Sequence, residues 1–349
     1  MEPKIEISMQ ISMAHAAPGN SVGLTVIITT SPTPSAPSTG LIAAVSQSFR
    51  THCPELLACP VIVILDTFDH VGAQPRLKKG VVTDEGAGHH DAYKQNVKRL
   101  VLAEYRRPRP DRGDGGDAPE PLVESRGQAE YGLETEANSV DLLISRTRDG
   151  RVTFVEPSKR LGFGLGVRSG LRLAGTPYVW IQQHDWPLAA DIPVRSILRV
   201  MDDGGRAETA AAPVKYVCLP SVRMRSYATS DHVVKFPALR ALTASLRSPR
   251  SVTDADAAVP LTPLFFWHDK PHLASTAHYL DRVFPTRLAM PRGAFIEDLV
   301  GQRARDQMKE GNWARWACWL YYPDDGKRLC VRHLQGRTRR GGPGEAWAG

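Results

Sequence analysis

The stretch that decides the fold is residues 152–188, VTFVEPSKRLGFGLGVRSGLRLAGTPYVWIQQHDWPL. It begins with VTFVE, a short alternating run rich in β-branched residues, which predicts a strand. From Gly162 the sequence is compatible with a helix, and TPYVWIQ is again typical of a strand. The order strand, helix, strand predicts a βαβ unit within an open α/β sheet.

The second strand of this unit ends in the polar residues Gln182, Gln183, His184 and Asp185. In an open α/β sheet, ligands bind beyond the carboxyl ends of the strands. An imidazole and a carboxylate at this place therefore predict a ligand site, and a divalent cation held by an aspartate and by phosphate oxygens suits them. A second interpretation is structural, with Asp185 as the N-cap of a helix that follows Pro187.

The first part of the chain shows the same alternation of strand and helix. Residues 23–30, GLTVIITT, predict a buried strand, which a Pro/Ser loop and a helix over 39–49 connect to a second strand within 59–69. Asp66 directly follows the apolar run VIVIL, so its carboxylate is expected at the carboxyl edge of the sheet. There we expect it either to accept hydrogen bonds from a nucleotide or to cap the next turn together with Asp69.

The composition limits the classes of function. With 349 residues, of which 42% are hydrophobic and 23% charged, the chain is long enough to bury a full core. Its formal net charge of +7 suits anionic ligands such as nucleotides. The positive charges are scattered, without a basic stripe or an aromatic platform, so nucleic acid is not an expected partner.

The cysteines and the apolar runs bear on the compartment. Five cysteines without CxxC spacing argue against a zinc ribbon and against a disulfide framework. No stretch approaches the roughly 18 to 20 apolar residues of a membrane span, and the first residues lack the pattern of a signal peptide. We expect a cytoplasmic protein with no integral membrane segment; the Golgi is the alternative if a leading anchor is missing from the sequence.

Changes in composition predict the domain boundaries. Residues 1–22 carry no pattern and are expected to be a disordered N-terminus, with a disordered tail at 338–349. Between them we expect a single domain over 23–337, with excursions at about 106–137 and 225–256. The first excursion is rich in Arg, Pro, Gly, Asp and Glu and lacks apolar periodicity, and the second is basic and Ser-rich.

The central stretch resembles family 2 glycosyltransferases of the GT-A fold, in which a Gly-rich helix precedes a hydrophobic strand and an acidic DxD motif. Here the helix is residues 162–175, the strand is Tyr178 to Gln182, and Gln183-His184-Asp185 stands where DxD is expected. Gln183 replaces the first carboxylate. The resemblance implies an α/β fold with a Rossmann-like mixed sheet flanked by helices, and a nucleotide-diphospho-sugar as the donor.

The same resemblance implies the residues of the donor site. It assigns the nucleotide contacts to Thr29, Thr30, Asp66, Arg168 and Gln183, and the metal, Mn²⁺ or Mg²⁺, to Asp185. Near the end of the chain, WLYYPDDGKRLCVRHL predicts a β-hairpin around residues 323–326, which would return His333 to the sheet. His333 is then expected as a second metal ligand, and Arg332 and Arg337 as partners of the diphosphate.

A second acidic motif, Glu297-Asp298 in GAFIEDLVGQRARDQM, precedes a helix-compatible run. Both carboxylates are expected at a helix N-terminus, where the dipole favours negative charge. Transfer with inversion needs a carboxylate that removes the proton of the acceptor hydroxyl. By the resemblance this base is Asp298, with Glu297 as the alternative, while a simple helix cap is the structural interpretation. The acceptor is not identified by the sequence.

Two other functions were weighed against glycosyl transfer. A nucleotidyltransferase usually carries a Gly-rich basic loop after its first strand, and SPTPSAPSTG has no basic residue. A catalytically inactive GT-A-like binding module agrees with Gln183 in place of an aspartate. His89, His90 and Asp91 lie in a stretch that predicts a helix through Tyr105, and we interpret this part of the helix as a solvated face rather than a metal site.

Overall fold

The computed structural model describes residues 23–105, 121–206, 212–246, 248–250 and 258–338. The strands are β1 (Leu24–Thr30), β2 (Val61–Leu65), β3 (His70–Val71), β4 (Val81–Val82), β5 (Val123–Glu130), β6 (Ser139–Arg146), β7 (Val152–Pro157), β8 (Tyr178–Gln183), β9 (Tyr216–Cys218), β10 (Ser248–Arg250), β11 (Val259–Pro263), β12 (His272–Ser275) and β13 (Cys318–Tyr321). The predicted boundaries of β1, β2, β7 and β8 agree with these within a few residues.

The helices are α1 (Gly40–His52), α2 (Glu55–Ala58), α3 (Asp84–Glu104), α4 (Phe163–Leu173), α5 (Val194–Arg206), α6 (Asp231–Val234), α7 (Pro237–Leu246), α8 (Thr276–Val283), α9 (Gln302–Lys309) and α10 (Trp313–Trp316). A π-helical turn, η5 (Glu297–Gly301), leads directly into α9. Short 3₁₀ turns are η1 (Leu77–Lys79), η2 (Glu136–Asn138), η3 (Val222–Met224), η4 (Tyr227–Thr229) and η6 (Pro323–Gly326).

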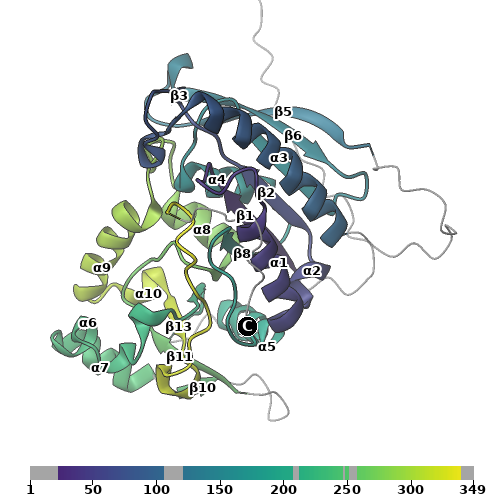
Figure 1. Cartoon of the computed structure of the whole chain (residues 1–349). Coiled ribbons are helices and arrows are strands. Elements are labelled where there is room, and N and C mark those ends of the chain that lie inside the picture. Colours follow the sequence, from purple (N-terminus) through teal and green to yellow (C-terminus); the bar gives the residue numbers. More distant parts are fainter. Residues whose placement is uncertain (1–22, 106–120, 207–211, 247, 251–257, 339–349) are drawn as a thin grey trace, which may run out of the picture.

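Most strands belong to one mixed sheet with helices on both faces, which confirms the predicted α/β class (Figure 1). Its eleven strands follow the order β10-β11-β13-β9-β12-β8-β1-β2-β7-β6-β5. The central strands β8, β1, β2 and β7 are parallel, whereas β12 runs antiparallel between β8 and β9. Every residue of β1 and β2 is buried, as the continuous apolar runs of these strands require.

The chain reverses its direction across the sheet at β1. From β1 it proceeds to β2 and then to β7, and after α4 it returns to β8 on the opposite side of β1. Right-handed crossovers in opposite directions place their helices on opposite faces of the sheet. Accordingly α1 packs with α3, and α4 packs with α8 (Figure 1). The space beyond the carboxyl ends of β1 and β8 is therefore the topological switch point of the sheet.

Helix α4 can lie close to this edge because Gly162 precedes it. Gly162 has a φ of 79°, and a Cβ built on it would lie 2.5 Å from the Cα of Gly293. A side chain at this position would meet backbone atoms and also strain the left-handed conformation. The absence of a side chain at Gly162 therefore allows the start of α4 to pack directly against the loop before η5.

The predicted C-terminal β-hairpin is wrong. The chain turns at Pro323–Gly326 as expected, but the residues after the turn form no strand against β13. The physical reason is that both edges of β13 are already occupied, by β11 and by β9. The C-terminal segment instead crosses to the loop after β8, where Val331 forms an isolated bridge with Leu188.

Both predicted excursions contain regular structure within their described residues. The first includes β5, which pairs along its length with β6, and the second includes α6 and α7, whose Val233 and Leu239 are buried. Residues 106–120, 247 and 251–256 of these excursions lie outside the described residues, as do 1–22 and 339–349 of the predicted termini. Among the helices that the structure describes, none combines the length and the apolar character needed to span a bilayer.

Candidate functional site

A pocket lies at the switch point of the sheet. Its walls come from the ends of β1 and β2, the residues after β8, the start of α4 and the C-terminal segment. The residues that line it include Thr29, Thr30, Asp66, Arg160, Gly162, Phe163, Gln183, His184, Phe295 and Arg337. Four residues predicted to contact a nucleotide, Thr29, Thr30, Asp66 and Gln183, thus lie in one pocket.

The two threonines that end β1 are nearly inaccessible in this structure. The Thr29 hydroxyl donates to the carbonyl of Gln182 on β8 at 3.4 Å. The Thr30 hydroxyl oxygen is buried, and its hydrogen-bonding neighbour is the Tyr93 hydroxyl. Thr30 therefore belongs to the pocket wall, but its hydroxyl would have to move to contact a ligand.

Asp66 anchors the start of α4. Its Oδ1 accepts a hydrogen bond from the backbone N–H of Leu161 at 2.7 Å, and its Oδ2 accepts one from Gly162 at 2.9 Å. Burial raises the pKa of Asp66 to about 6, while these backbone donors and the charge of Arg160 oppose the shift. Neither interpretation made from the sequence included this anchor. A nucleotide could use only the remaining lone pairs of the two oxygens.

Asp185 contacts His333, although 148 positions separate them in the sequence. The Nε2 atom of His333 lies 3.1 Å from Oδ2 of Asp185, and the backbone N–H of Gly336 donates to the same oxygen at 3.0 Å. A further hydrogen bond, from Leu334 N–H to the Asp185 carbonyl at 2.8 Å, holds the C-terminal segment beside the loop after β8. The two residues predicted as metal ligands are therefore neighbours; neither lines the pocket itself, whereas the adjacent His184 and the nearby Arg337 do.

The surroundings of Asp185 favour its charged form. Burial alone would raise the pKa of this carboxyl, but the hydrogen bond from His333 and the charges of His184 and His333 lower it to about 2. The His333 ring stacks on Trp186 with ring centroids 4.4 Å apart, which fixes its orientation. The side chain of His184 is buried, and burial lowers its pKa, while the charge of Asp185 opposes this shift.

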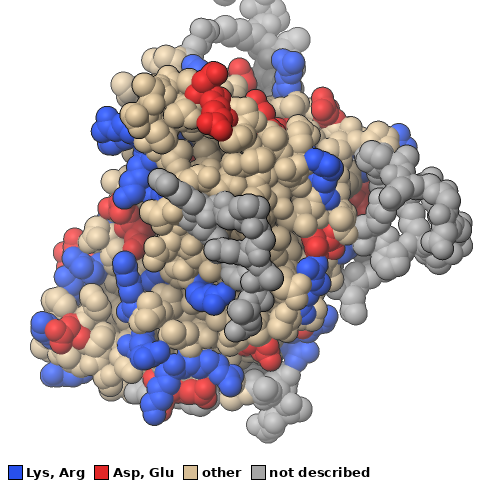
Figure 2. Space-filling view, in the orientation of Figure 1, with Lys and Arg blue, Asp and Glu red and all other residues tan. Residues whose placement is uncertain are grey.

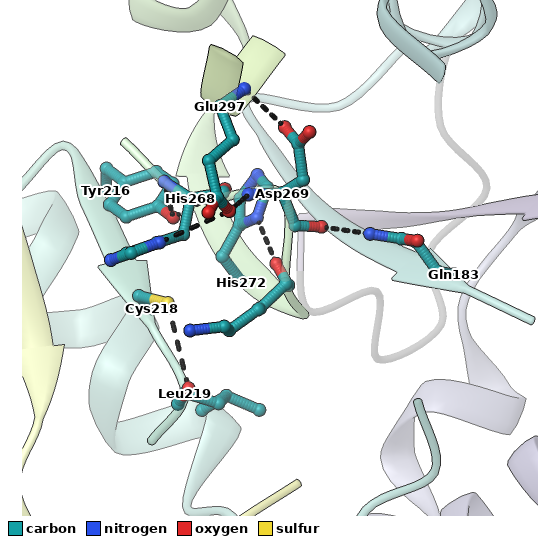
Figure 3. Close-up of polar contacts among 9 residues, drawn as sticks. Gln183, Tyr216, Cys218, Leu219, His268, Asp269, His272 and Glu297 are labelled. Carbon is teal, nitrogen blue, oxygen red and sulfur yellow. Dashed lines mark hydrogen bonds and ion pairs between the residues drawn. The ribbon is translucent and has the colours of Figure 1, made fainter. Parts of the chain in front are cut away.

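Gln183 connects the pocket to a second polar cluster (Figure 3). Its amide nitrogen donates to the Asp269 carbonyl at 2.8 Å. The Asp269 carboxylate accepts from the backbone N–H of Glu297 at 3.1 Å, and Glu297 Oε2 accepts from Asp269 N–H at 3.3 Å. The same Glu297 oxygen lies 3.3 Å from Nδ1 of His268. The residue in the position of the first DxD carboxylate thus positions the loop that carries His268 and Asp269.

The two residues of the Glu297-Asp298 motif differ in their surroundings. Glu297 is partly buried; burial opposes the charged form, but His268 and the Asp269 N–H lower its pKa to about 2. Asp298 is exposed and forms no hydrogen bond or ion pair with any described residue. Both lie in η5, two and three positions after Phe295, which lines the pocket. Neither carboxylate lines the pocket, and Asp298 is the more exposed of the two.

Arg168, predicted as a nucleotide contact, is not among the pocket residues. Its guanidinium is buried in α4, with no hydrogen-bond partner for either terminal nitrogen among the described residues. Burial and the nearby Arg172 lower its pKa to about 10. The pocket contains Arg160 and Phe295, which the sequence analysis missed. Arg160 lies two positions before Gly162 in the sequence. Its position next to the glycine-rich helix could have identified it as a residue of the site.

The Asp185–His333 pair fits a divalent cation. Its two side chains would hold a cation through the carboxylate and the imidazole nitrogen, in place of the proton that now joins them. A carboxylate and an imidazole together suit Mn²⁺, and substrate phosphates commonly complete such sites. The described ranges contain no group of three or more His, Cys, Asp or Glu side chains arranged for one ion.

Comparisons with known proteins provide no relative for this chain: no protein-family model matches it, and no curated protein does.

Proposed function

We propose that the protein is a metal-dependent glycosyltransferase of the GT-A fold that transfers a sugar from a nucleotide-diphospho-sugar to an acceptor hydroxyl. The observation that supports this most directly is the contact of Asp185 with His333 beside a pocket at the switch point of the sheet. Arg337, four positions after His333, lines the same pocket and contributes a positive charge for a diphosphate. Mn²⁺ or Mg²⁺ would be held by Asp185 and His333.

The donor would lie across the carboxyl ends of β1 and β8. Its nucleoside would contact Thr29, Thr30 and the outer lone pairs of Asp66, whose principal role is to hold α4 in place. Its diphosphate would lie towards Asp185 and Arg337. The bound cation would neutralise charge on the departing diphosphate.

Asp298 would act as the general base. As the acceptor oxygen forms a bond to the anomeric carbon, its proton passes to the Asp298 carboxylate, and the bond from that carbon to the diphosphate oxygen breaks with its electron pair. A single displacement of this kind inverts the anomeric centre. Glu297 is a positioning residue, because its hydrogen bonds with His268 and Asp269 fix the start of η5.

A catalytically inactive binding module is the second candidate, and two observations favour it. Gln183 uses its amide to hold the Asp269 carbonyl, and one oxygen of Asp185 already accepts two hydrogen bonds within the chain. In such a protein the same pocket would bind a nucleotide without transferring a sugar.

A thermal-shift titration tests the proposal. The purified chain is titrated with UDP, GDP and CMP, each with and without Mn²⁺, because a ligand that binds only the native state must raise the melting temperature. We expect one nucleotide to raise the Tm, and only when the metal is present. The Asp185→Asn variant should abolish this shift, whereas Asp141→Asn, which changes an exposed aspartate of β6, should leave it unchanged.

The outcomes separate the two candidates. Metal-dependent nucleotide binding with hydrolysis or transfer of the matching sugar donor supports the transferase. Metal-dependent binding without either reaction supports the inactive module. If no nucleotide raises the Tm under any condition, both candidates are rejected.

A further inference from the structure

A groove lies next to the pocket, on the outer side of the loop between β3 and β4. Its lining residues include Pro75, Arg76, Leu77, Lys78, Lys79, Thr83, Glu85, Gly86, His89, His90, Arg337 and Thr338. The groove and the pocket share Pro32, Leu77, Val82 and Arg337, so the two spaces adjoin. Helix α3 begins at its wall, with Thr83 as the N-cap.

The charges that line the groove are predominantly positive. Arg76, Lys78 and Lys79 are exposed, and none forms an ion pair with a described residue. Glu85 is the single carboxylate of the lining, and it is 3.8 Å from the imidazole of His89. Figure 2 shows blue side chains at the upper left edge of this face, near β3, with red side chains on the neighbouring upper part of the surface. An anion in the groove would meet several cations that have no competing partner.

The basic loop is held in a defined conformation. Lys79 N–H donates to the Arg76 carbonyl at 2.7 Å, and the Arg160 guanidinium donates to the Lys78 carbonyl at 3.1 Å. Gly80, with a φ of 72°, ends the turn, and a Cβ on it would lie 2.6 Å from Oδ2 of Asp69. The three cations therefore extend from a folded turn. Because the backbone of the turn is already ordered, less conformational entropy is lost when an anion binds.

His90 gives the groove an unsatisfied polar group. It lines the groove and is fully buried; the backbone of Asp66 is a hydrogen-bonding neighbour of its ring, which leaves one ring nitrogen without a partner among the described residues. The interpretation of this part of α3 as a solvated face is thus wrong for His90, whose ring packs between Phe68 and Tyr93. Burial and the charge of Lys94 lower its pKa to about 4, so the ring is neutral, and the nitrogen that does not face the Asp66 backbone can accept from a protonated oxygen of a ligand.

We propose that this groove is a binding site for a phosphate- or sulfate-bearing ligand, with Arg76, Lys78 and Lys79 as its counter-charges and His90 as a hydrogen-bonding partner at its buried wall. Such a ligand is either a separate molecule or an anionic extension of the molecule in the pocket. The residues involved differ from those proposed to bind the metal and to remove the proton, so this site does not depend on glycosyl transfer.

Calorimetric titration of the full chain with sodium pyrophosphate tests the site. The triple variant Arg76→Gln/Lys78→Gln/Lys79→Gln should bind pyrophosphate about tenfold more weakly, because each solvent-exposed ion pair contributes up to ~1 kcal/mol. The matched control is Arg126→Gln/Arg148→Gln/Arg223→Gln, which removes the same net charge from exposed positions outside the groove. We expect this control to retain the wild-type affinity within about twofold.

His90→Phe tests the buried wall without changing net charge at neutral pH. It should weaken pyrophosphate binding severalfold, while the urea midpoint shows whether the variant is folded. If wild-type protein does not bind pyrophosphate, or if both triple variants lose affinity equally, the proposed site is rejected.

A titration with UDP and Mn²⁺ separates the two sources of the anion. If the groove binds a separate molecule, the groove variant keeps its UDP affinity, and pyrophosphate still binds to the UDP complex. If the groove holds an extension of the ligand in the pocket, the groove variant loses affinity for both, and UDP displaces pyrophosphate. Binding of pyrophosphate without any binding of UDP supports the groove while rejecting the proposed transferase.

Discussion

Asp66 and Asp185 carry the same sequence signal but have different surroundings. Each lies just beyond an apolar strand of the central parallel sheet, and each is buried. Both oxygens of Asp66 accept from backbone N–H groups at the start of α4, whereas Asp185 contacts an imidazole from the C-terminal segment. The pKa of Asp66 is raised by burial, and that of Asp185 is lowered by His333 against the effect of burial.

The difference teaches that position alone does not determine the role of a carboxylate at the end of a strand. The donors around it decide whether it is a structural anchor or a charged group available to a ligand. Asp66 holds the fold of the site, and Asp185 is the residue we propose for its chemistry. The following variants test this division.

The largest expected effect concerns Asp298, a third carboxylate that neither anchors backbone nor contacts a histidine. Asp298→Asn should reduce turnover about 10³-fold, because general-base catalysis contributes roughly 10²- to 10⁴-fold. Nucleotide binding should not change. Steady-state kinetics and a nucleotide titration measure the two effects, with Asp306→Asn on the exposed face of α9 as the control. Loss of nucleotide binding in Asp298→Asn would contradict the assignment.

The next effect concerns stability. Asp66→Ala removes the acceptor of two buried N–H groups, and each unsatisfied group costs about 1–3 kcal/mol. The free energy of unfolding should therefore fall by about 3 kcal/mol, as measured by urea denaturation. Asp185→Ala should cost clearly less, because its imidazole partner is half exposed. An equal decrease in the free energy of unfolding of the two variants would contradict the assignment of Asp66 as the structural anchor and Asp185 as the site residue.

The pH dependence should have opposite signs for the two aspartates. The folded-state pKa of Asp66, about 6, exceeds its ordinary value of 3.8, so its contribution to stability is lost as the pH rises through this interval. The folded-state pKa of Asp185, about 2, lies below 3.8, so its contribution is present above that value and is lost as the pH falls. The effect of Asp66 is on the order of 3 kcal/mol, and that of Asp185 is smaller, at about 1 kcal/mol, because its partner His333 is half exposed and solvent screens the interaction.

Urea midpoints between about pH 2 and pH 7 measure these slopes, since a pKa difference between folded and unfolded states makes stability depend on pH. Asp66→Asn should remove the decline between pH 4 and 6, and Asp185→Asn should remove the decline below pH 4. The same slope in both variants would contradict the opposite environments of the two carboxyl groups.

The smallest effect concerns the partner of Asp185. His333→Gln should lower the free energy of unfolding by less than about 1 kcal/mol, because partly exposed ion pairs contribute little. His89→Gln, which removes an exposed pair with Glu85, is the matched control and should have almost no effect. A loss of several kcal/mol in His333→Gln would indicate that the pair is mainly a structural latch for the C-terminal segment.

The sequence predicted the central part of the fold because its signals are local. Continuous apolar runs identified β1, β2 and β8, and the glycine-rich stretch identified α4. The order of the motifs also predicted that Asp185 and His333 share a site, and the structure places them in contact. Their role as metal ligands remains a proposal.

The features that escaped prediction depend on partners distant in sequence. The hairpin failed because β9 and β11 occupy both edges of β13, which no local pattern reveals. Strand β5, VESRGQAE, was missed because most of its side chains are exposed, and its backbone pairing with β6 leaves no apolar periodicity. The donors to Asp66 are backbone N–H groups, which have no signature in the sequence.

The central claim is that Asp185, and not Asp66, serves the cation and the donor. Its most direct test is electron paramagnetic resonance of Mn²⁺ in the presence of UDP, which measures free and bound metal. Mn²⁺ should bind to the wild type and to a folded Asp66→Asn variant, and it should remain free with Asp185→Asn. Undiminished Mn²⁺ binding by Asp185→Asn would contradict the account.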